Sequence, residues 1–346
     1  MSNMGNINDV EKTADPDAQR LVDRFGREVT YLRLSVTDRC DFRCIYCMAE
    51  EMTFLPRSEI LTLEELALVG RAFVELGVQK IRMTGGEPLV RKGVLGLVET
   101  LAEMQGLKSL VMTTNGSHLK SQAVALRKAG IKRLNISLDS LKPERFKHLT
   151  RVGDLETVLE GIDAALNAGF EGIKLNVVAL RNRNHDEVLD LVRFALAREI
   201  DISFIEEMPL GQVDGRLRGE EFYPSSLIRA DIAQAFELLP SSLDTGGPSR
   251  YWRIEGYGTR IGFISPHSEN FCASCNRVRV TAEGKLLLCL GNEHSMDLRP
   301  IVRAHPEQTG PLKEAIREAM ALKPERHHFD LGEKPVILRH MSRTGG

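Results

Sequence analysis

Six cysteines constrain this chain most, because they fall into two tight groups of three. The first group is Cys40, Cys44 and Cys47, in C-x-x-x-C-x-x-C spacing, and the second is Cys272, Cys275 and Cys289. A 4Fe–4S cluster takes four ligands, usually thiolates. Six cysteines cannot complete two four-cysteine sites, and none is left over. We therefore expect two clusters, each of which lacks one protein ligand.

Three thiolates leave one iron of a 4Fe–4S cluster open to a small chelating molecule. The amino and carboxylate groups of S-adenosylmethionine (SAM) form such a chelate. Structural zinc is the alternative, but zinc sites usually have four ligands, often as two C-x-x-C pairs. The first triad has no fourth cysteine or histidine close by, so its spacing favours a cluster. For the second triad the alternative is a cluster that only transfers electrons.

Composition indicates an ordinary globular chain of 346 residues, with 42% apolar and 27% charged residues and a formal net charge of −2. This charge gives no bulk attraction to nucleic acid or to a membrane surface, so we expect neither as a partner. No apolar run approaches the ~20 residues that span a bilayer. The N-terminus lacks an apolar signal core, which predicts a cytoplasmic protein with a flexible leader at residues 1–24.

Strand and helix patterns alternate about six times between residues 31 and 206. Strands are expected at 31–36, 79–83, 109–112, 132–136, 172–179 and 201–206. Between them, helices are expected from Thr62 to Gly77, at 93–104, from Ser117 to Gly130, from Asp154 to Gly169 and at 186–199. The alternation predicts an α/β fold with a parallel sheet, either doubly wound or a partial (β/α)6 barrel, over residues 25–235. Short strands at 251–254, 260–264, 277–281 and 285–289 predict a smaller mixed region over residues 236–346.

Polar residues follow the predicted strands, at the end of a barrel where catalytic groups lie. They are Gly86 and Glu87 in the loop T-G-G-E-P, Thr113 to Asn115, Ser137, Asp139 and Met208. Glycines allow the backbone to approach a ligand closely, and Glu87 is expected to accept a hydrogen bond from the SAM ammonium. Ser117 is instead expected to cap a helix.

The second triad is expected to be closed by a β-hairpin. Pairing residue 281 with residue 285 places Cys289 opposite Arg277. Alternation then puts Cys275, Arg277, Arg279 and Cys289 on one face, and Val278, Val280, Leu286 and Leu288 on the other. An open iron beside two arginines predicts an anionic substrate that also binds the cluster.

Together these motifs resemble the radical SAM superfamily and, within it, the GTP 3′,8-cyclase family of molybdenum cofactor biosynthesis. The first resemblance rests on the cysteine spacing with Tyr46 before the last cysteine, and on G-G-E one strand later. The second runs from about Phe25 to Gly346 and includes Y-L-R-L-S-V-T-D-R-C, N-I-S-L-D-S-L, F-I-E-E-M-P-L-G, C-A-S-C-N-R-V-R-V and the final G-G. It implies a TIM-type barrel of the radical SAM type that converts GTP to 3′,8-cyclo-7,8-dihydro-GTP after hydrogen abstraction from C3′.

The resemblance also implies roles for individual residues. It maps GTP contacts onto Arg33, Lys80, Arg82, Thr113, Lys174, Arg277 and Arg279, and SAM contacts onto Tyr46, Gly86, Ser137 and Met208. Arg277, Arg279 and the terminal Gly345 and Gly346 are expected to act in catalysis, with the tail threaded close to SAM. The implied partners are GTP, a flavodoxin- or ferredoxin-type electron donor and the next enzyme, cyclic pyranopterin monophosphate synthase. A homodimer is a further expectation.

Two alternatives remain open at this point. One is a different radical SAM enzyme with an auxiliary cluster, such as a peptide-modifying maturase, although maturases usually carry more C-terminal cysteines. The other is a zinc-binding structural or RNA-binding protein, against which the net charge of −2 argues. The nine histidines show no ligand pattern, and His327 and His328 are expected to form a surface or helix-end pair.

Overall fold

The computed structural model describes residues 20–211, 218–327, 329, 337 and 339–345. Its first half alternates strands and helices. The strands are β1 (Tyr31–Ser35), β2 (Lys80–Thr84), β3 (Ser109–Thr114), β4 (Arg133–Ser137), β5 (Gly172–Val178) and β6 (Asp201–Ile205). The helices are α1 (Leu63–Glu75), α2 (Val94–Ala102), α3 (Leu119–Ala129), α4 (Pro143–Thr150), α5 (Leu155–Asn167) and α6 (Val188–Ala197). Neighbouring strands from β1 to β6 pair in parallel, which confirms the predicted barrel-type fold.

The second half adds strands to both ends of the same sheet. They are β7 (Leu238–Pro240), β8 (Arg250–Ile254), β9 (Arg260–Ile264), β10 (Arg277–Val280), β11 (Lys285–Leu287) and β12 (Ser295–Asp297). The order is β12-β11-β10-β1-β2-β3-β4-β5-β6-β9-β8-β7. Both β9 and β10 pair in parallel, with β6 and β1 respectively. The expected C-terminal region is therefore continuous with the barrel sheet in the part of the chain described here.

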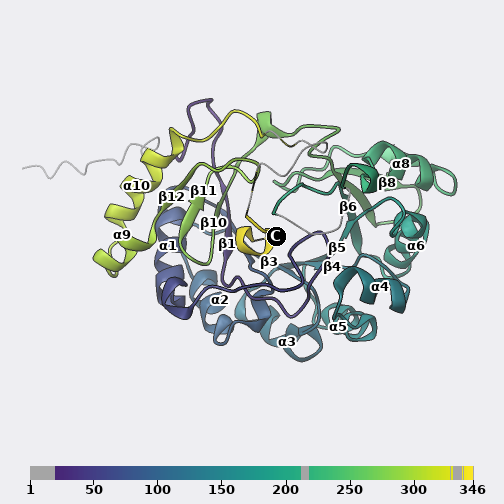
Figure 1. Cartoon of the computed structure of the whole chain (residues 1–346), viewed down its shortest axis with the longest axis horizontal. Helices are drawn as coiled ribbons and strands as arrows, with labels where there is room; N and C mark the ends of the chain where they lie inside the picture. The colour runs from purple at the N-terminus through teal and green to yellow at the C-terminus, as the bar shows by residue number, and fades with distance from the viewer. Residues whose placement is uncertain (1–19, 212–217, 328, 330–336, 338, 346) are drawn as a thin grey trace, which may run out of the picture.

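The remaining helices are α7 (Arg218–Glu221), α8 (Ser225–Ala233), α9 (Arg299–Ala304), α10 (Gly310–Met320) and α11 (Met341–Thr344). Figure 1 shows a curved sheet with α1 to α6 on its outer side and the short α11 within the curve. None of the described helices is long and apolar enough to cross a membrane.

Two helix starts follow from their sequences as expected. Thr62 and Glu65 form a reciprocal capping box at α1, and Asp154 accepts a hydrogen bond from the Thr157 amide at α5. Ser117 does not cap α3, contrary to expectation. Its hydroxyl donates instead to Asp41 Oδ2 at 2.6 Å, and His118 occupies the N-cap position without a side-chain bond. The structure also contains α4, β7 and β12, which the sequence patterns did not predict.

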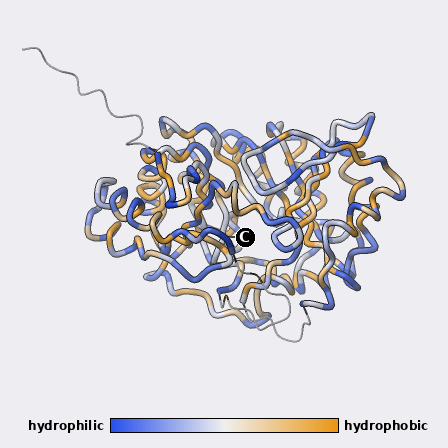
Figure 2. The backbone as a smooth tube through the Cα atoms, turned by 90° about the horizontal axis from the view of Figure 1, so that it is seen from above, coloured by the Kyte–Doolittle hydropathy of each residue, from blue (hydrophilic) through white to orange (hydrophobic). Residues whose placement is uncertain are grey.

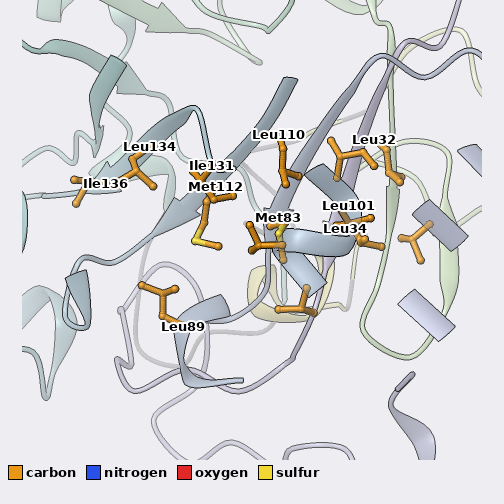
Figure 3. Packing of buried hydrophobic residues seen from close by; sticks show 14 of the residues in the cluster. Leu32, Leu34, Met83, Leu89, Leu101, Leu110, Met112, Ile131, Leu134 and Ile136 are labelled. Atoms are coloured by element: carbon orange, nitrogen blue, oxygen red, sulfur yellow. The ribbon is translucent and has the colours of Figure 1, made fainter. Parts of the chain in front are cut away.

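Alternation along the strands separates the core from the functional face. On β1 to β4 the apolar side chains Leu32, Leu34, Met83, Leu110, Met112, Leu134 and Ile136 pack with Leu101 of α2 (Figure 3). The intervening residues include Arg33, Arg82 and Thr113, which line a cavity on the concave side. Apolar and polar stretches alternate along the coloured part of the tube (Figure 2). Because successive side chains point to opposite faces, a strand contributes to the core and to the cavity at once.

The described end of the expected leader is part of the fold. Leu21 is buried, and Val22 pairs with Glu28 in an antiparallel bridge. Asp23 is also buried. The rest of the expected leader, residues 1–19, lies outside the described residues, as do His328 and Gly346.

Candidate active site

One cavity on the concave side of the sheet brings together nearly all the residues expected to act. Its lining includes all six cysteines, Arg33, Lys80, Arg82, Thr113, Lys174, Arg277 and Arg279, and Tyr46, Gly86, Ser137 and Met208. Among the described residues, two of the expected ones are not in the lining. Glu87 lies behind it, and Gly345 contacts lining residues without being one.

The first triad lies in the loop after β1, and the glycine loop after β2 supports it from behind. A Cβ on Gly86 would lie 2.4 Å from the Arg39 carbonyl oxygen, next to Cys40. The Gly86 amide donates to Thr37 O at 2.8 Å, and the Glu87 amide donates to Arg39 O at 2.8 Å. The close approach that requires glycine here is thus to the cysteine loop rather than to a ligand.

Glu87 holds two loops together from a fully buried position. Its carboxylate accepts hydrogen bonds from the Leu89 amide at 3.0 Å, the Thr114 hydroxyl at 2.8 Å and the Asn115 amide at 2.6 Å. Burial raises its pKa to about 8. These contacts hold the carboxylate against the end of β3 and the loop that follows it, and Glu87 is not among the residues that line the cavity.

Tyr46, from the cysteine loop, and Ser137, at the end of β4, both line the cavity. The Tyr46 hydroxyl donates to Asp139 Oδ2 at 2.5 Å, and the Val178 amide donates to Asp139 Oδ1 at 2.8 Å. Burial raises the pKa of Asp139 to about 6. The carboxylate therefore fixes the tyrosine of the cysteine loop to the ends of β4 and β5, beside Ser137.

The predicted hairpin at the second triad is confirmed in register and in facing. Arg279 pairs with Leu287 and Val280 with Leu286, and the Thr281 amide donates to Lys285 O at 2.9 Å. Val278, Val280, Leu286 and Leu288 are buried in the core, and Cys275, Arg277, Arg279 and Cys289 line the cavity, which Val278 and Leu288 also touch. The strands are shorter than predicted, since β10 ends at Val280 and β11 at Leu287.

The two triads have different electrostatic surroundings. Burial raises the pKa of Cys40, Cys44 and Cys47, that of Cys47 to about 12. In the second triad, burial is outweighed at Cys272 by a hydrogen bond to His327, and at Cys275 by the charges of Arg277 and Lys323. The pKa of each of these two thiols is consequently lowered, whereas burial raises that of Cys289. Cysteine binds metal as the thiolate. Neighbouring cations therefore favour the metal-binding form more at the second triad than at the first.

Three arginines lie in one row across adjacent strands. Arg33 on β1 is in register with Arg279 on β10 and with Arg82 on β2. Adjacent strands are about 4.8 Å apart. Burial and the charge of Arg277 lower the pKa of Arg279 to about 10. Burial and the charges of Arg279 and Arg82 move the pKa of Arg33 well below its usual value. Such a row is suited to an anion with several negative charges.

Further polar side chains extend this row across the cavity. Lys80 Nζ donates to Thr245 O at 2.9 Å, and Lys174 Nζ donates to the Tyr251 hydroxyl at 3.2 Å. Arg82 contacts Thr113 Oγ1 at 3.1 Å and the Tyr31 hydroxyl at 2.5 Å. Burial tends to raise the pKa of Tyr31, but Arg82, Arg33 and Lys80 outweigh it and lower the pKa to about 7.

The C-terminal segment connects the first triad with the arginine row. The Met341 amide donates to Cys47 O at 3.2 Å. The Gly345 carbonyl accepts from Arg33 Nη2 at 2.8 Å and from Arg279 Nη1 at 3.4 Å. The segment thus lies beside the first cysteine triad, and its Gly345 carbonyl oxygen contacts both arginines.

His327 was misassigned by sequence reasoning. It is buried rather than on the surface, with Nδ1 3.0 Å from Cys272 Sγ and Nε2 2.9 Å from Pro266 O. No local pattern identifies it, because its partners are more than fifty residues away in sequence. Tyr31 was also missed, although strand alternation signals it: it is two residues before Arg33 and so shares its face.

The donor sets fit iron–sulfur clusters at both triads. All six cysteines are free, and each triad faces the shared cavity. The Phe42 amide lies 3.4 Å from Cys40 Sγ, and Lys323 Nζ lies 3.7 Å from Cys275 Sγ. Thiolate ligands with hydrogen-bond donors at the sulfurs are the usual protein environment of such clusters.

Comparison with known proteins agrees with this geometry. Residues 34–195 match the Radical SAM superfamily, and residues 200–329 match the family described as Molybdenum Cofactor Synthesis C. SuiB from Streptococcus suis has a similar fold, with a TM-score of 0.60 at 14% identity over 84% of this chain and 69% of that one. A barrel of this type, with a three-cysteine motif that leaves one cluster iron without a protein ligand, is the defining feature of a radical SAM enzyme.

Closer relatives identify the family. GTP 3′,8-cyclase from Saccharophagus degradans is 61% identical over 94% of this chain and 98% of its own length. The protein of the same name from Pseudomonas putida is 59% identical over 96% of this chain and 100% of its own. The chain therefore belongs to the GTP 3′,8-cyclase family. The similarity supports this family over the two alternatives that the sequence left open, a peptide-modifying maturase and a zinc-binding protein.

Proposed function

We propose that the chain converts GTP to 3′,8-cyclo-7,8-dihydro-GTP, the first step of molybdenum cofactor biosynthesis. The observation that carries this proposal is the in-register row of Arg279, Arg33 and Arg82 in a cavity that both cysteine triads also line. A triphosphate matches this row, because guanidinium groups bind phosphate oxygens in pairs. Both triads line this cavity, so one can serve the chemistry and the other the recognition of the substrate.

Cys40, Cys44 and Cys47 would hold a 4Fe–4S cluster, which when bound would supply the electron for reductive cleavage of SAM. Tyr46, Gly86, Ser137 and Met208 bind SAM beside it. Tyr46 is held in place by Asp139. Glu87 supports the site by fixing the loops through its contacts with Thr114 and Asn115.

The substrate lies between the triads, with its triphosphate on the cationic side chains. Arg33, Lys80, Arg82, Thr113, Lys174, Arg277 and Arg279 bind it. Cys272, Cys275 and Cys289 would hold the second 4Fe–4S cluster, which would supply a binding site for the guanine base. Abstraction of hydrogen from C3′ leaves a carbon radical that adds to C8 of the base, and one electron and one proton then complete the product. Gly345 acts by ordering Arg33 and Arg279 through its carbonyl oxygen, and a catalytic role for Gly346 is part of the same proposal.

Several further assignments belong to the same proposal. The electron donor is of flavodoxin or ferredoxin type, and the product passes to cyclic pyranopterin monophosphate synthase. The chain acts in the cytoplasm as a homodimer. Its boundaries are a leader at 1–24, a barrel at 25–235 and a C-terminal region at 236–346.

The test is transfer of deuterium from substrate to SAM-derived product. The anaerobically reconstituted enzyme is incubated with SAM, dithionite and GTP deuterated at C3′, and 5′-deoxyadenosine is analysed by mass spectrometry. We expect one deuterium in 5′-deoxyadenosine and cyclised product in equal amount. Unlabelled 5′-deoxyadenosine from a fully reconstituted enzyme would contradict the proposal.

Two variants test the arginine contacts in the same assay. Arg277→Ala and Arg279→Ala should each retain their iron but lose at least tenfold in kcat/KM for GTP, because a hydrogen bond to a charged group is worth about 1.5–3 kcal/mol. Arg250→Ala is the matched control, since Arg250 lies on β8 with 59% of its side chain exposed and pairs with Glu269. Equal activity of all three variants would refute the phosphate contacts.

A further inference from the structure

Lys323 is a buried lysine beside the second triad. It follows α10, and only 1% of its surface is exposed. Its Nζ lies 3.7 Å from Cys275 Sγ and 3.9 Å from Asp23 Oδ2. An ammonium group is rarely buried unless it is paired and hydrogen-bonded, because it loses its hydration. The contacts with Cys275 and Asp23 therefore account for the burial of the Lys323 ammonium group.

Asp23 is already engaged by Arg27. The carboxylate accepts from Arg27 Nε at 2.6 Å, and from the amides of Phe25 and Arg27 at 2.9 and 3.0 Å. Lys323 lies beyond hydrogen-bonding distance of Asp23, so the aspartate attracts it mainly as a charge. Its position is then set by Cys275 on the other side.

A count of formal charges gives the same conclusion. Arg27 and Lys323 bring two positive charges to this site, and Asp23 brings one negative charge. The remaining donors of Arg27 bind carbonyl oxygens, of Cys272 at 2.9 Å, Glu325 at 2.7 Å and Pro324 at 2.7 Å. Among these groups one positive charge is left over, and Cys275 is the group next to it that becomes an anion when it binds iron.

We propose that Lys323 is a positioning residue for the second cluster, which donates a hydrogen bond to the Cys275 sulfur and raises the cluster's reduction potential. The proposal rests on the proposed function, in which the second triad holds a 4Fe–4S cluster. Hydrogen bonds to ligand sulfurs and nearby charge are the means by which proteins set such potentials. Reduction adds one negative charge to the cluster, and a fixed cation at the sulfur stabilises it. Asp23 and Arg27 keep the cation in place.

The first cluster is an internal reference for this effect. Lys323 contacts Cys275 of the second triad, whereas the first triad lies in the loop between β1 and α1. Its removal should therefore change one potential and leave the other unchanged. Lys313 is a matched control, because it lies on α10 and pairs with Glu75 at 2.7 Å.

The experiment is an anaerobic reductive titration of the complete two-cluster enzyme, followed by electron paramagnetic resonance of both clusters. The variants are Lys323→Met, Lys323→Arg and Lys313→Met. In Lys323→Met we expect the equilibrium constant for reducing the second cluster to fall at least tenfold, which is a shift of about 59 mV to lower potential. Lys323→Arg keeps the charge and should stay near the wild-type potential, and Lys313→Met should match it.

Each outcome decides the proposal. A shift confined to the second cluster in Lys323→Met supports it, as does loss of that cluster's iron from Lys323→Met but not from Lys323→Arg. An unchanged potential in Lys323→Met overturns it, as does a loss of folded structure in both Lys323 variants, which would make the lysine a purely structural residue. Absence of a second cluster from the wild-type enzyme would instead refute the proposed function.

Discussion

Replacing Gly345 with alanine tests how closely the C-terminal segment must fit. Gly345 has a φ of +80°, and its carbonyl oxygen receives hydrogen bonds from Arg33 and Arg279. A Cβ at this position would lie 2.4 Å from Thr84 Oγ1 and 3.3 Å from Ser35 Cβ. The first distance is well inside van der Waals contact, so either the threonine or the tail must move.

The cost of this substitution can be bounded from two effects. The left-handed backbone conformation costs an alanine roughly 1–2 kcal/mol, and overpacking a close-packed site costs roughly 1–3 kcal/mol. Their sum, on the order of 2–5 kcal/mol, is comparable with the hydrogen bonds that hold the tail. We therefore expect the tail to leave its site while the barrel stays folded. A loss of about 3 kcal/mol corresponds to roughly a hundredfold fall in cyclisation.

The assay measures 5′-deoxyadenosine and cyclised product from Gly345→Ala after its iron content and melting temperature have been checked. The control is Gly96→Ala, since a Cβ on Gly96 would meet nothing within 4 Å and the residue lies inside α2. It should gain about 1 kcal/mol of stability with unchanged activity. Thr84→Ala in the Gly345→Ala background should restore part of the activity, because it removes the atom at 2.4 Å. Wild-type product yield from Gly345→Ala alone, or no rescue by Thr84→Ala, would refute the reasoning.

The remaining predictions concern the clusters and one buried carboxylate. Anaerobic reconstitution should give two 4Fe–4S clusters per chain by iron and sulfide analysis; stoichiometric zinc with little iron would contradict this. Cys44→Ala should abolish SAM cleavage, whereas Cys275→Ala should impair GTP cyclisation yet retain some uncoupled cleavage in the 5′-deoxyadenosine assay. Burial raises the pKa of Glu87 from 4.5 to about 8, so between these values the folded protein retains a proton that the unfolded chain has lost. The free energy of unfolding of the iron-free protein should therefore fall as pH rises through this window. Glu87→Gln should reduce this pH dependence of the free energy of unfolding, measured by urea titrations at several pH values. An equal pH dependence in the variant and the wild type would contradict the raised pKa of Glu87.

The sequence predicted the parts of the site that depend on local pattern. Strand alternation places Arg277 and Arg279 on the face of Cys275, and the structure agrees. The hairpin register followed from the length of the loop at Gly284, whose φ of +88° suits glycine. These features need only neighbours in sequence, so one chain is enough to predict them.

Contacts between distant segments could not be predicted in this way. His327 approaches Cys272 across 55 positions, and Lys323 approaches Asp23 across 300. Glu87 was expected to face a ligand, but Thr114 and Asn115, which belong to the next strand and its loop, hold it. In each case the side chain is fixed by an element whose place depends on the whole sheet. Sequence patterns specify which face a residue occupies, and they leave its partner open.

The pairing of β10 with β1 explains why two triads more than two hundred residues apart share one cavity. Without this pairing, the hairpin of the second triad would have no fixed relation to the cysteine loop that follows β1. With it, Arg279 lies in register with Arg33, and the two residues meet at the Gly345 carbonyl oxygen. Parallel pairing also aligns the strand directions, so that the first triad follows β1 at one end of the strand pair, whereas Cys272 and Cys275 precede β10 at the other. The antiparallel strand β11 then returns Cys289 to the same end as Cys272 and Cys275. A substrate that spans the cavity can therefore contact both ends at once, which a cluster on a separate domain would not ensure.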